Sequence, residues 1–134
     1  MKITSRMVED EVFEAQNEAG ICSLMDMRGS DKKQSLNPPE VLLGALASCG
    51  GVDVVTMLRK RKKTIINFFI ETEGIRNEIP PRYFKKIHLL FTLESPDIAE
   101  KELYKWVNLA LKKYCTVASS LKSEISFSVK VIQP

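Results

Sequence analysis

The sequence predicts a single α+β domain over residues 1–134, with the element order β-β-β-α-β-β-α-α-β. The chain has 134 residues, of which 44% are hydrophobic and 28% are charged, and this is the length and balance of one ordinary globular domain. Several short segments alternate apolar and polar residues, as half-buried strands do. Of two longer segments, one is apolar on nearly every face, and the other repeats its apolar residues at helical spacing.

The N-terminal part predicts a β-meander followed by a loop. Three short segments rich in β-formers are joined by an acidic turn and by the turn Asn17-Glu18-Ala19-Gly20. The segment Met27 to Gln34 contains glycine, serine and four charges without periodicity, which predicts a loop. The three predicted strands are Lys2 to Val8, Val12 to Gln16 and Ile21 to Asp26.

A long apolar helix is predicted to begin at Asn37 and to run through Leu58. Asn37 can cap it, the two prolines that follow suit a first turn, and Glu40 lies where an acid favours the helix dipole. Apolar residues occupy nearly every face of this helix, so it needs neighbours on all sides. Because a chain of this length has few other helices, we expect a homodimer.

Charge and composition exclude several classes of partner. The net charge of +3 is small, and no aromatic residue interrupts the cations at positions 59–63, so we expect no nucleic-acid binding. Polar residues and glycines interrupt the apolar helix, so we expect no membrane span. The charged N-terminus is not a signal peptide, and a cytoplasmic location is the expectation.

The second half of the chain predicts two paired strands, two helices and a last strand. Ser95-Pro96-Asp97 is predicted to start an amphipathic helix that ends near Cys115, and Thr116 can cap the short helix after it. The predicted strands are Ile65 to Glu73, Lys85 to Glu94 after a loop over Gly74 to Tyr83, and Ile125 to Val131; the short helix is Val117 to Leu121.

Three cysteines, Cys22, Cys49 and Cys115, are too few and too scattered for a disulfide scaffold or a zinc site. With one histidine, His88, in the chain, we expect no metal. Cys49 precedes two glycines that each cost about 1 kcal/mol inside a helix, which indicates either tight packing or space beside the sulfur. From these settings alone Cys49 and Cys115 can be inert or reactive, and Cys22 is predicted to be a buried structural residue.

Three segments resemble a known family in their order and spacing: PPEVLLGALASCGGVDVVTMLRKR, GIRNEIPPRYFKKIHLLFTL and LALKKYCTVASSL. Together they resemble the OsmC/Ohr family from about Asn37 to the C-terminus, and most closely its less characterised OsmC-like branch. The resemblance implies an intertwined homodimer in which sheets wrap two central helices, with active sites at the dimer interface. It implies no cofactor and no metal.

The resemblance also implies a thiol-dependent peroxidase that reduces organic hydroperoxides in oxidative stress defence. Cys49 is then the peroxidatic cysteine, Cys115 resolves its sulfenic acid, and a small dithiol is the reductant. Family peroxidases also use a glutamate, for which Glu40 is the candidate, and an arginine, for which no motif matches. The candidate arginines are Arg6, Arg28, Arg76 and Arg82.

Physical reasoning leaves alternatives open at several of these positions. Nine residues separate Glu40 from Cys49, which puts them on opposite faces of a straight helix about 13 Å apart along its axis. Glu40 can therefore equally be a first-turn acid. Asp53, on the face of Cys49, suits an interface hydrogen bond, and His88 suits the surface. The alternative function is a dimeric small-molecule-binding or thiol-sensing module without efficient catalysis.

Overall fold

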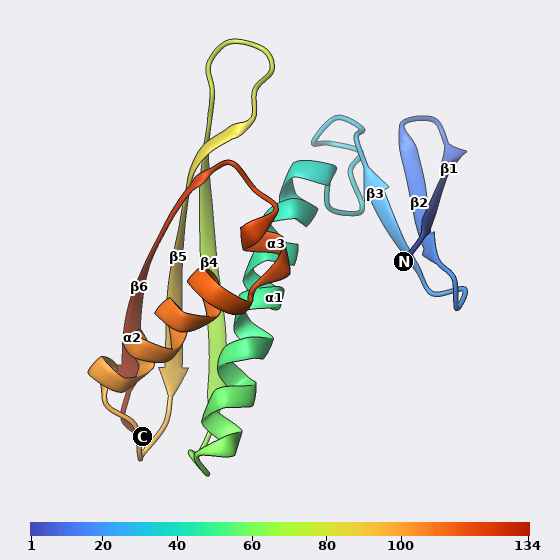
Figure 1. Cartoon of the computed structure of the whole chain (residues 1–134). Coiled ribbons are helices and arrows are strands. Elements are labelled where there is room, and N and C mark those ends of the chain that lie inside the picture. Colours follow the sequence, from blue (N-terminus) through green and yellow to red (C-terminus); the bar gives the residue numbers. More distant parts are fainter. The chain divides into compact units, whose positions relative to one another are not determined.

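The computed structural model describes all residues, 1–134. It confirms the predicted α+β order and adds a π-helical segment, η1 (Figure 1). Contacts group the chain into two compact units, Met1–Leu42 and Leu43–Pro134. One domain over residues 1–134 stays a prediction. The elements are β1 (Ile3–Glu9), β2 (Val12–Asn17), β3 (Cys22–Asp26), α1 (Pro38–Lys60), β4 (Asn67–Arg76), β5 (Phe84–Glu94), α2 (Glu100–Leu109), η1 (Ala110–Tyr114), α3 (Thr116–Ser119) and β6 (Glu124–Ile132).

The unit Met1–Leu42 contains the predicted meander, an antiparallel sheet in the order β1-β2-β3. Its two turns each use a residue with positive φ, Glu11 at 61° and Gly20 at 86°. The Asn17 side chain closes the second turn by accepting hydrogen bonds from the backbone N–H groups of Ala19 and Ile21, at 3.0 and 2.9 Å. These contacts give the turn its fixed shape, as asparagine side chains commonly do.

Cys22 begins β3 and is exposed, so the prediction that it is buried is wrong. The physical reason is that this sheet buries little of either face. Among the residues of its three strands, Val12 and Asp26 are the buried ones. The Cys22 thiol donates instead to the nearby carbonyl of Gly20, at 3.4 Å.

Helix α1 begins as the sequence predicts, with Asn37 as its cap. The Asn37 side chain accepts a hydrogen bond from the Glu40 N–H at 2.9 Å, and the Asn37 N–H donates to the Glu40 carboxylate at 3.0 Å. This reciprocal pair is a capping box. Arg59 and Lys60 lie in the last turn, where the dipole favours cations.

By length and composition, α1 is long and apolar enough to cross a membrane. The core helix of a soluble protein satisfies the same criterion. Only 28% of the most apolar 18-residue stretch of α1 is buried within this chain. Much of the apolar surface of α1 is therefore uncovered by the chain itself.

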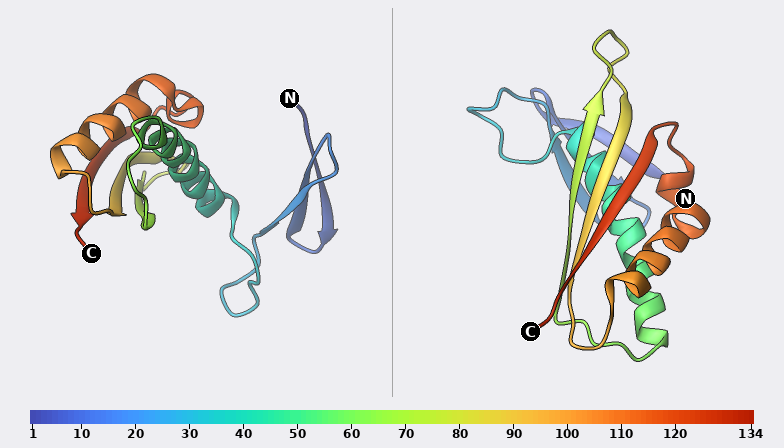
Figure 2. Two further views of the ribbon diagram at one scale, coloured as in Figure 1. Left: turned by 90° about the horizontal axis from the view of Figure 1, so that it is seen from below. Right: turned by 90° about the vertical axis from the view of Figure 1, so that its left-hand side faces the viewer.

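The unit Leu43–Pro134 is built on a sheet in the order β4-β5-β6, in which β4 and β5 are antiparallel and β5 and β6 are parallel. Helices α1 and α2 lie against one face of this sheet (Figure 2). The inward residues of β5 are almost completely buried against them. These residues are Ile87, Leu89, Phe91 and Leu93.

Strand β4 extends three residues beyond its predicted end at Glu73 and reaches Arg76. The predicted loop over 74–83 is thus too long, because Gly74 and Ile75 still pair with β5. A glycine inside a strand suits the close approach of another group. Here the ring of Phe84 fills the place of the missing side chain, since a Cβ on Gly74 would lie 2.5 Å from Phe84 Cδ1.

The first residue of α2 and the capping residue of α3 both differ from the prediction. Helix α2 begins at Glu100, because Ser95 and Asp97 serve other contacts. The Asp97 carboxylate accepts hydrogen bonds from the Thr64 N–H at 3.0 Å and from the Ser95 hydroxyl at 2.9 Å. Helix α3 is capped by Cys115 and not by the predicted Thr116.

Candidate thiol site

The structure brings Cys49 and Cys115 side by side, although 66 residues separate them in the sequence. Cys49 lies in the middle of α1 and is half-buried, whereas Cys115 follows η1 and is fully buried. Both are free thiols. Burial raises the pKa of the Cys115 thiol above its ordinary value, and the neighbouring Cys49 thiol raises it further. At neutral pH Cys115 is therefore protonated.

A π turn sets the position of Cys115. Its N–H donates to the carbonyl of Ala110 at 2.8 Å, five residues earlier, where an α-helix would use the fourth. The chain then leaves the helix at Cys115, and the sulfur accepts a hydrogen bond from the Ala118 N–H at 3.4 Å. This bond favours the thiolate but does not offset burial. Sequence reasoning missed the π turn, because no residue pattern marks it.

The two glycines after Cys49 let α1 approach its neighbours closely. A Cβ on Gly50 would lie 3.0 Å from Leu111 Cδ2, and one on Gly51 would lie 3.0 Å from Ile70 Cδ1. Ordinary contacts between carbon atoms are about 3.5–4.0 Å. Of the two interpretations that the sequence left open, tight packing is therefore the one observed. Leu111 belongs to η1, so this contact holds the segment before Cys115 against the helix that carries Cys49.

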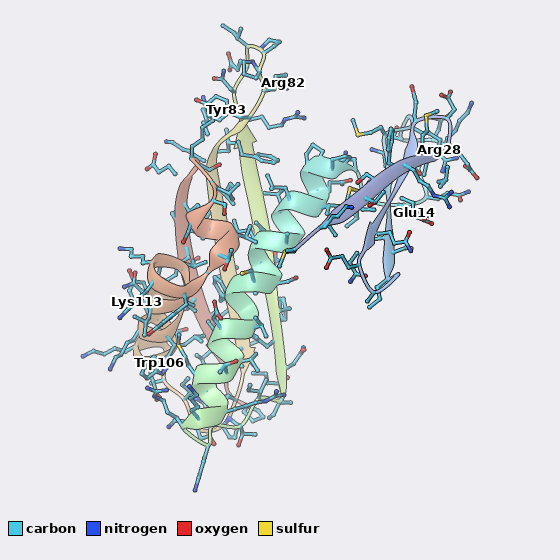
Figure 3. The ribbon with its side chains drawn as sticks, turned by 45° about the vertical axis from the view of Figure 1, so that its right-hand side comes forward. Glu14, Arg28, Arg82, Tyr83, Trp106 and Lys113 are labelled. Atoms are coloured by element: carbon cyan, nitrogen blue, oxygen red, sulfur yellow. The ribbon has the colours of Figure 1, made fainter.

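A groove lies between α1 and the α2–η1 segment, with a volume of about 450 Å³. The guanidinium of Arg61 stacks 3.5 Å above the Trp106 ring at one end of it. Figure 3 shows Trp106, on α2, and Lys113, on η1, beside α1. Sequence reasoning missed this groove, because it pairs segments distant in the chain. We call it the α1–α2 groove; its lining residues are Asp53, Thr56, Met57, Lys60, Arg61, Trp106, Leu109 and Tyr114.

Glu40 occupies the first turn of α1, where its carboxylate takes part in the capping box with Asn37. This local role is one of the two that the sequence left open. Cys49 follows nine residues later on the same helix. A catalytic role for Glu40 stays a prediction.

The candidate arginine nearest to α1 in sequence, Arg28, is held by two carboxylates of its own unit. It donates to Asp26 from Nε at 3.0 Å and from Nη2 at 2.7 Å, and to Glu9 from Nη1 at 3.2 Å. The Arg28 side chain, by hydrogen bonding, holds the pKa of the Asp26 carboxyl well below its usual range. Figure 3 labels Glu14, which lies in β2, and Arg28, two residues beyond the end of β3.

The other candidate arginines have different positions. Arg6 pairs with Glu14 at 3.6 Å in the N-terminal sheet. Arg76 donates from Nε to the backbone carbonyl of Arg82 at 3.0 Å, and Arg82 lies at the tip of the β4–β5 hairpin (Figure 3). The activating arginine that the family resemblance implies therefore stays unassigned.

His88 lies on the exposed face of the second sheet, as the sequence suggests. Its Nδ1 is 2.8 Å from the Ser126 hydroxyl and its Nε2 is 3.0 Å from the Ser128 hydroxyl. Both ring nitrogens are thus occupied by β6, the strand beside β5. No three His, Cys, Asp or Glu side chains gather in a way that could hold a metal ion.

Comparison with known proteins gives consistent matches. Residues 29–130 match the family model described as OsmC-like protein. Protein YhfA of Escherichia coli K12 is 30% identical over 128 residues, which are 96% of this chain and 94% of YhfA. An OsmC-like protein from Mycoplasma pneumoniae has a TM-score of 0.81 at 23% identity, over 98% of this chain and 95% of that one. The organic hydroperoxide resistance protein OhrB of Bacillus subtilis has a TM-score of 0.62 at 14% identity, over 98% and 96%.

The two structural likenesses show a shared fold. Family membership rests on the other two matches, because the family model covers residues 29–130 and the YhfA match spans nearly the whole chain. The matched range includes both motif cysteines, Cys49 and Cys115, and the helix that the resemblance was drawn from. The resemblance seen in the sequence is confirmed, and the chain belongs to the OsmC-like protein family.

Proposed function

We propose that this chain is a thiol-dependent peroxidase that reduces organic hydroperoxides in the cytoplasm. Membership of the OsmC/Ohr group suggests a role in oxidative stress defence. The observation that supports the peroxidase proposal is that Cys49 and Cys115 lie side by side in the core between the helices and the second sheet. A second thiol beside the first is what a cysteine peroxidase needs to resolve its oxidised intermediate.

Burial assigns the two roles. Cys49 is half-buried and is the more accessible of the two cysteines, so it is assigned the attack on the peroxide, as a thiolate. The O–O bond breaks, the alcohol leaves with a proton, and Cys49 becomes a sulfenic acid. Cys115, fully buried, then attacks this sulfur, water leaves, and a disulfide forms. A small dithiol reduces the disulfide and is itself oxidised to a cyclic disulfide.

The acting unit in this proposal is a homodimer in which a second copy covers the open face of α1. That face carries small and apolar residues, and Val52 within it is 60% exposed. Exposed apolar surface of this kind commonly marks a protein interface. The exposed residues of the face are Ala45, Ser48, Val52 and Thr56.

A second candidate function is a dimeric binding or thiol-sensing module without efficient catalysis. Two observations favour it. The Glu40 carboxylate is engaged in a helix cap, and the candidate arginine Arg28 is held by Asp26 and Glu9. Such a module would take up its ligand whether or not Cys49 and Cys115 are present.

The test is the consumption of an organic hydroperoxide, such as cumene hydroperoxide, with dithiothreitol as the reductant. We expect turnover that Cys49→Ser abolishes. Cys115→Ser should leave the first oxidation intact, so that one equivalent of peroxide is consumed and a sulfenic acid accumulates that dimedone labels at Cys49. Cys22→Ser is the matched control, because Cys22 is exposed in the other unit and should not affect turnover.

Turnover that survives in Cys49→Ser would contradict the peroxidase assignment. Absence of turnover in the unaltered protein, together with ligand binding that is unchanged in the Cys49→Ser, Cys115→Ser double variant, would establish the second candidate instead. Sedimentation of the purified chain at micromolar concentration tests the dimer. A monomer there would contradict the proposed covering of α1.

A further inference from the structure

Leu111 joins the segment that carries Cys115 to the helix that carries Cys49. It lies in η1, four residues before Cys115, and is almost fully buried. Its Cδ2 atom lies beside Gly50, the residue that directly follows Cys49, because a Cβ on Gly50 would be only 3.0 Å from it. The missing side chain of Gly50 therefore leaves the space that Leu111 occupies.

Backbone hydrogen bonds fix Cys115 within its own segment. Its N–H donates to the Ala110 carbonyl at 2.8 Å, and its sulfur accepts from the Ala118 N–H at 3.4 Å. Its carbonyl accepts from the Ser119 N–H at 3.1 Å and from the Ser119 hydroxyl at 2.9 Å. All these partners belong to η1 and α3 and none to α1. The distance from Cys115 to Cys49 therefore depends on how this segment packs against α1.

The formation of a disulfide tolerates little displacement of either cysteine. The two Cα atoms must come within about 7 Å, with the Cβ atoms directed toward each other. For reacting groups in general, a misplacement of about 1 Å can slow a step about 10²-fold. By the same measure, a displacement of about 0.5 Å would slow the attack of Cys115 about tenfold.

We propose that Leu111 is the positioning residue of the resolving step, and that its contact with Gly50 holds Cys115 where it can attack oxidised Cys49. The inference rests on the peroxidase function proposed above. Leu111 takes no part in the bond changes and acts through Cys115. Its role is to keep η1 against α1 while the sulfur of Cys49 is oxidised and resolved.

The contact decides between two fates of the Cys49 sulfenic acid. If the Cys115 thiol attacks first, the S–S bond forms, the S–O bond breaks, and the hydroxyl leaves with the thiol proton as water. If a second hydroperoxide arrives first, its O–O bond breaks, one oxygen is transferred to the Cys49 sulfur to give a sulfinic acid, and the alcohol leaves. A dithiol reopens the disulfide but not the sulfinic acid. Placing Cys115 correctly therefore protects Cys49 from irreversible oxidation.

The two adjacent glycines provide a matched pair of variants. The methyl group of Gly50→Ala would lie 3.0 Å from Leu111 Cδ2, so that Leu111 must withdraw by roughly 0.5 Å. The methyl group of Gly51→Ala would meet Ile70 Cδ1 at the same 3.0 Å, but Ile70 belongs to β4. Both variants overpack the same helix equally, and only Gly50→Ala acts on the segment that carries Cys115.

The measurement is the ratio of sulfinic acid to disulfide after oxidation with cumene hydroperoxide, determined by intact-protein mass spectrometry. We expect Gly50→Ala to raise this ratio about tenfold at a given peroxide concentration, and Gly51→Ala to leave it unchanged. The rate constant for the first oxidation of Cys49, followed by dimedone labelling in a Cys115→Ser background, should be the same with and without Gly50→Ala. A ratio that rises equally in both glycine variants, or in neither, would overturn the proposal.

Leu111→Ala removes the contact without adding a clash, and it tests the proposal even if Gly50→Ala does not fold. We expect it also to raise the ratio of sulfinic acid to disulfide. Because the two substitutions act on one contact, Gly50→Ala should cause no further increase in the Leu111→Ala background. Effects that simply multiply in the double variant would contradict a role for this contact.

Thiol exchange separates this inference from the function it rests on. With oxidised dithiothreitol in place of a peroxide, the Cys49–Cys115 disulfide forms through a mixed disulfide and without hydroperoxide chemistry. We expect this closure to be about tenfold slower in Gly50→Ala and unchanged in Gly51→Ala. If hydroperoxide does not oxidise Cys49 but this difference is found, the peroxidase function fails and the positioning of Cys115 by Leu111 is supported. Turnover with hydroperoxide but no difference in either assay would overturn the positioning role alone.

Discussion

Replacing Gly50 by alanine tests how tightly the thiol site is packed. The added methyl group would lie 3.0 Å from Leu111 Cδ2, whereas the next side-chain atom, Phe91 Cζ, is at an ordinary 3.9 Å. A normal carbon contact is at least about 3.5 Å, so Leu111 must withdraw by roughly 0.5 Å. Leu111 is almost fully buried in η1, which leaves it little room to move.

Two opposing effects set the magnitude. Alanine in place of glycine stabilises a helix interior by about 1 kcal/mol, and overpacking a core costs about 1–3 kcal/mol. Gly44→Ala on the same helix provides the control, because no atom of the chain lies within 4 Å of its Cβ position. The helix gain is common to both variants. Gly50→Ala should therefore be about 1–3 kcal/mol less stable than Gly44→Ala.

Urea unfolding followed by Trp106 fluorescence and far-ultraviolet circular dichroism measures this difference. In a Leu111→Ala background the obstructing methyl group is gone, so the difference between the two alanine variants should fall close to zero. A difference below about 0.5 kcal/mol in the normal background would refute the reasoning, since this is the usual error of additivity. So would a difference of equal size in both backgrounds.

Three further outcomes follow from the charges. Burial raises the pKa of the Cys115 thiol, and the neighbouring Cys49 thiol raises it further, so alkylation of Cys115 at pH 8 should be faster in Cys49→Ser. An unchanged rate would contradict the close contact between the two thiols. The depressed pKa of Asp26 contributes stability that is complete at neutral pH and is lost as pH falls below roughly 4; the loss of stability on acidification should therefore be smaller in Asp26→Asn, by urea unfolding at pH 3 and 7. Glu40→Gln keeps the capping box, so we expect unchanged helix stability by urea unfolding; a loss of peroxidase turnover in this variant would assign a catalytic charge to Glu40.

Much of the fold follows from local pattern. The β-branched and aromatic residues of β5, the alternation in β6, the asparagine cap of α1 and the turn residues before β3 each predict the element that the structure contains, because neighbouring residues alone satisfy them. Errors arise where a distant partner competes for the same groups. Asp97 bonds to Thr64 instead of starting α2, and β5 extends β4 through Gly74.

The thiol site was likewise predictable only where it depends on local sequence. Motifs identify Cys49 and Cys115, and the paired glycines indicate an unusual contact. The partner in that contact, Leu111, and the π turn that orients Cys115 were not predictable, because both depend on how η1 packs against α1. The prediction for Cys22 was wrong for a related reason: its strand is regular, but the sheet around it leaves both faces largely exposed.

The sequence by itself determined the family, the order of strands and helices, and the two cysteines on which the proposed function depends. These are properties of residue type and spacing, which persist however the chain is folded. Only the tertiary structure decided that the cysteines lie side by side, and that Cys115 is buried and stays protonated. Each of these depends on which parts of the chain pack together, because a side chain is buried and its pKa is shifted only where packing removes it from water.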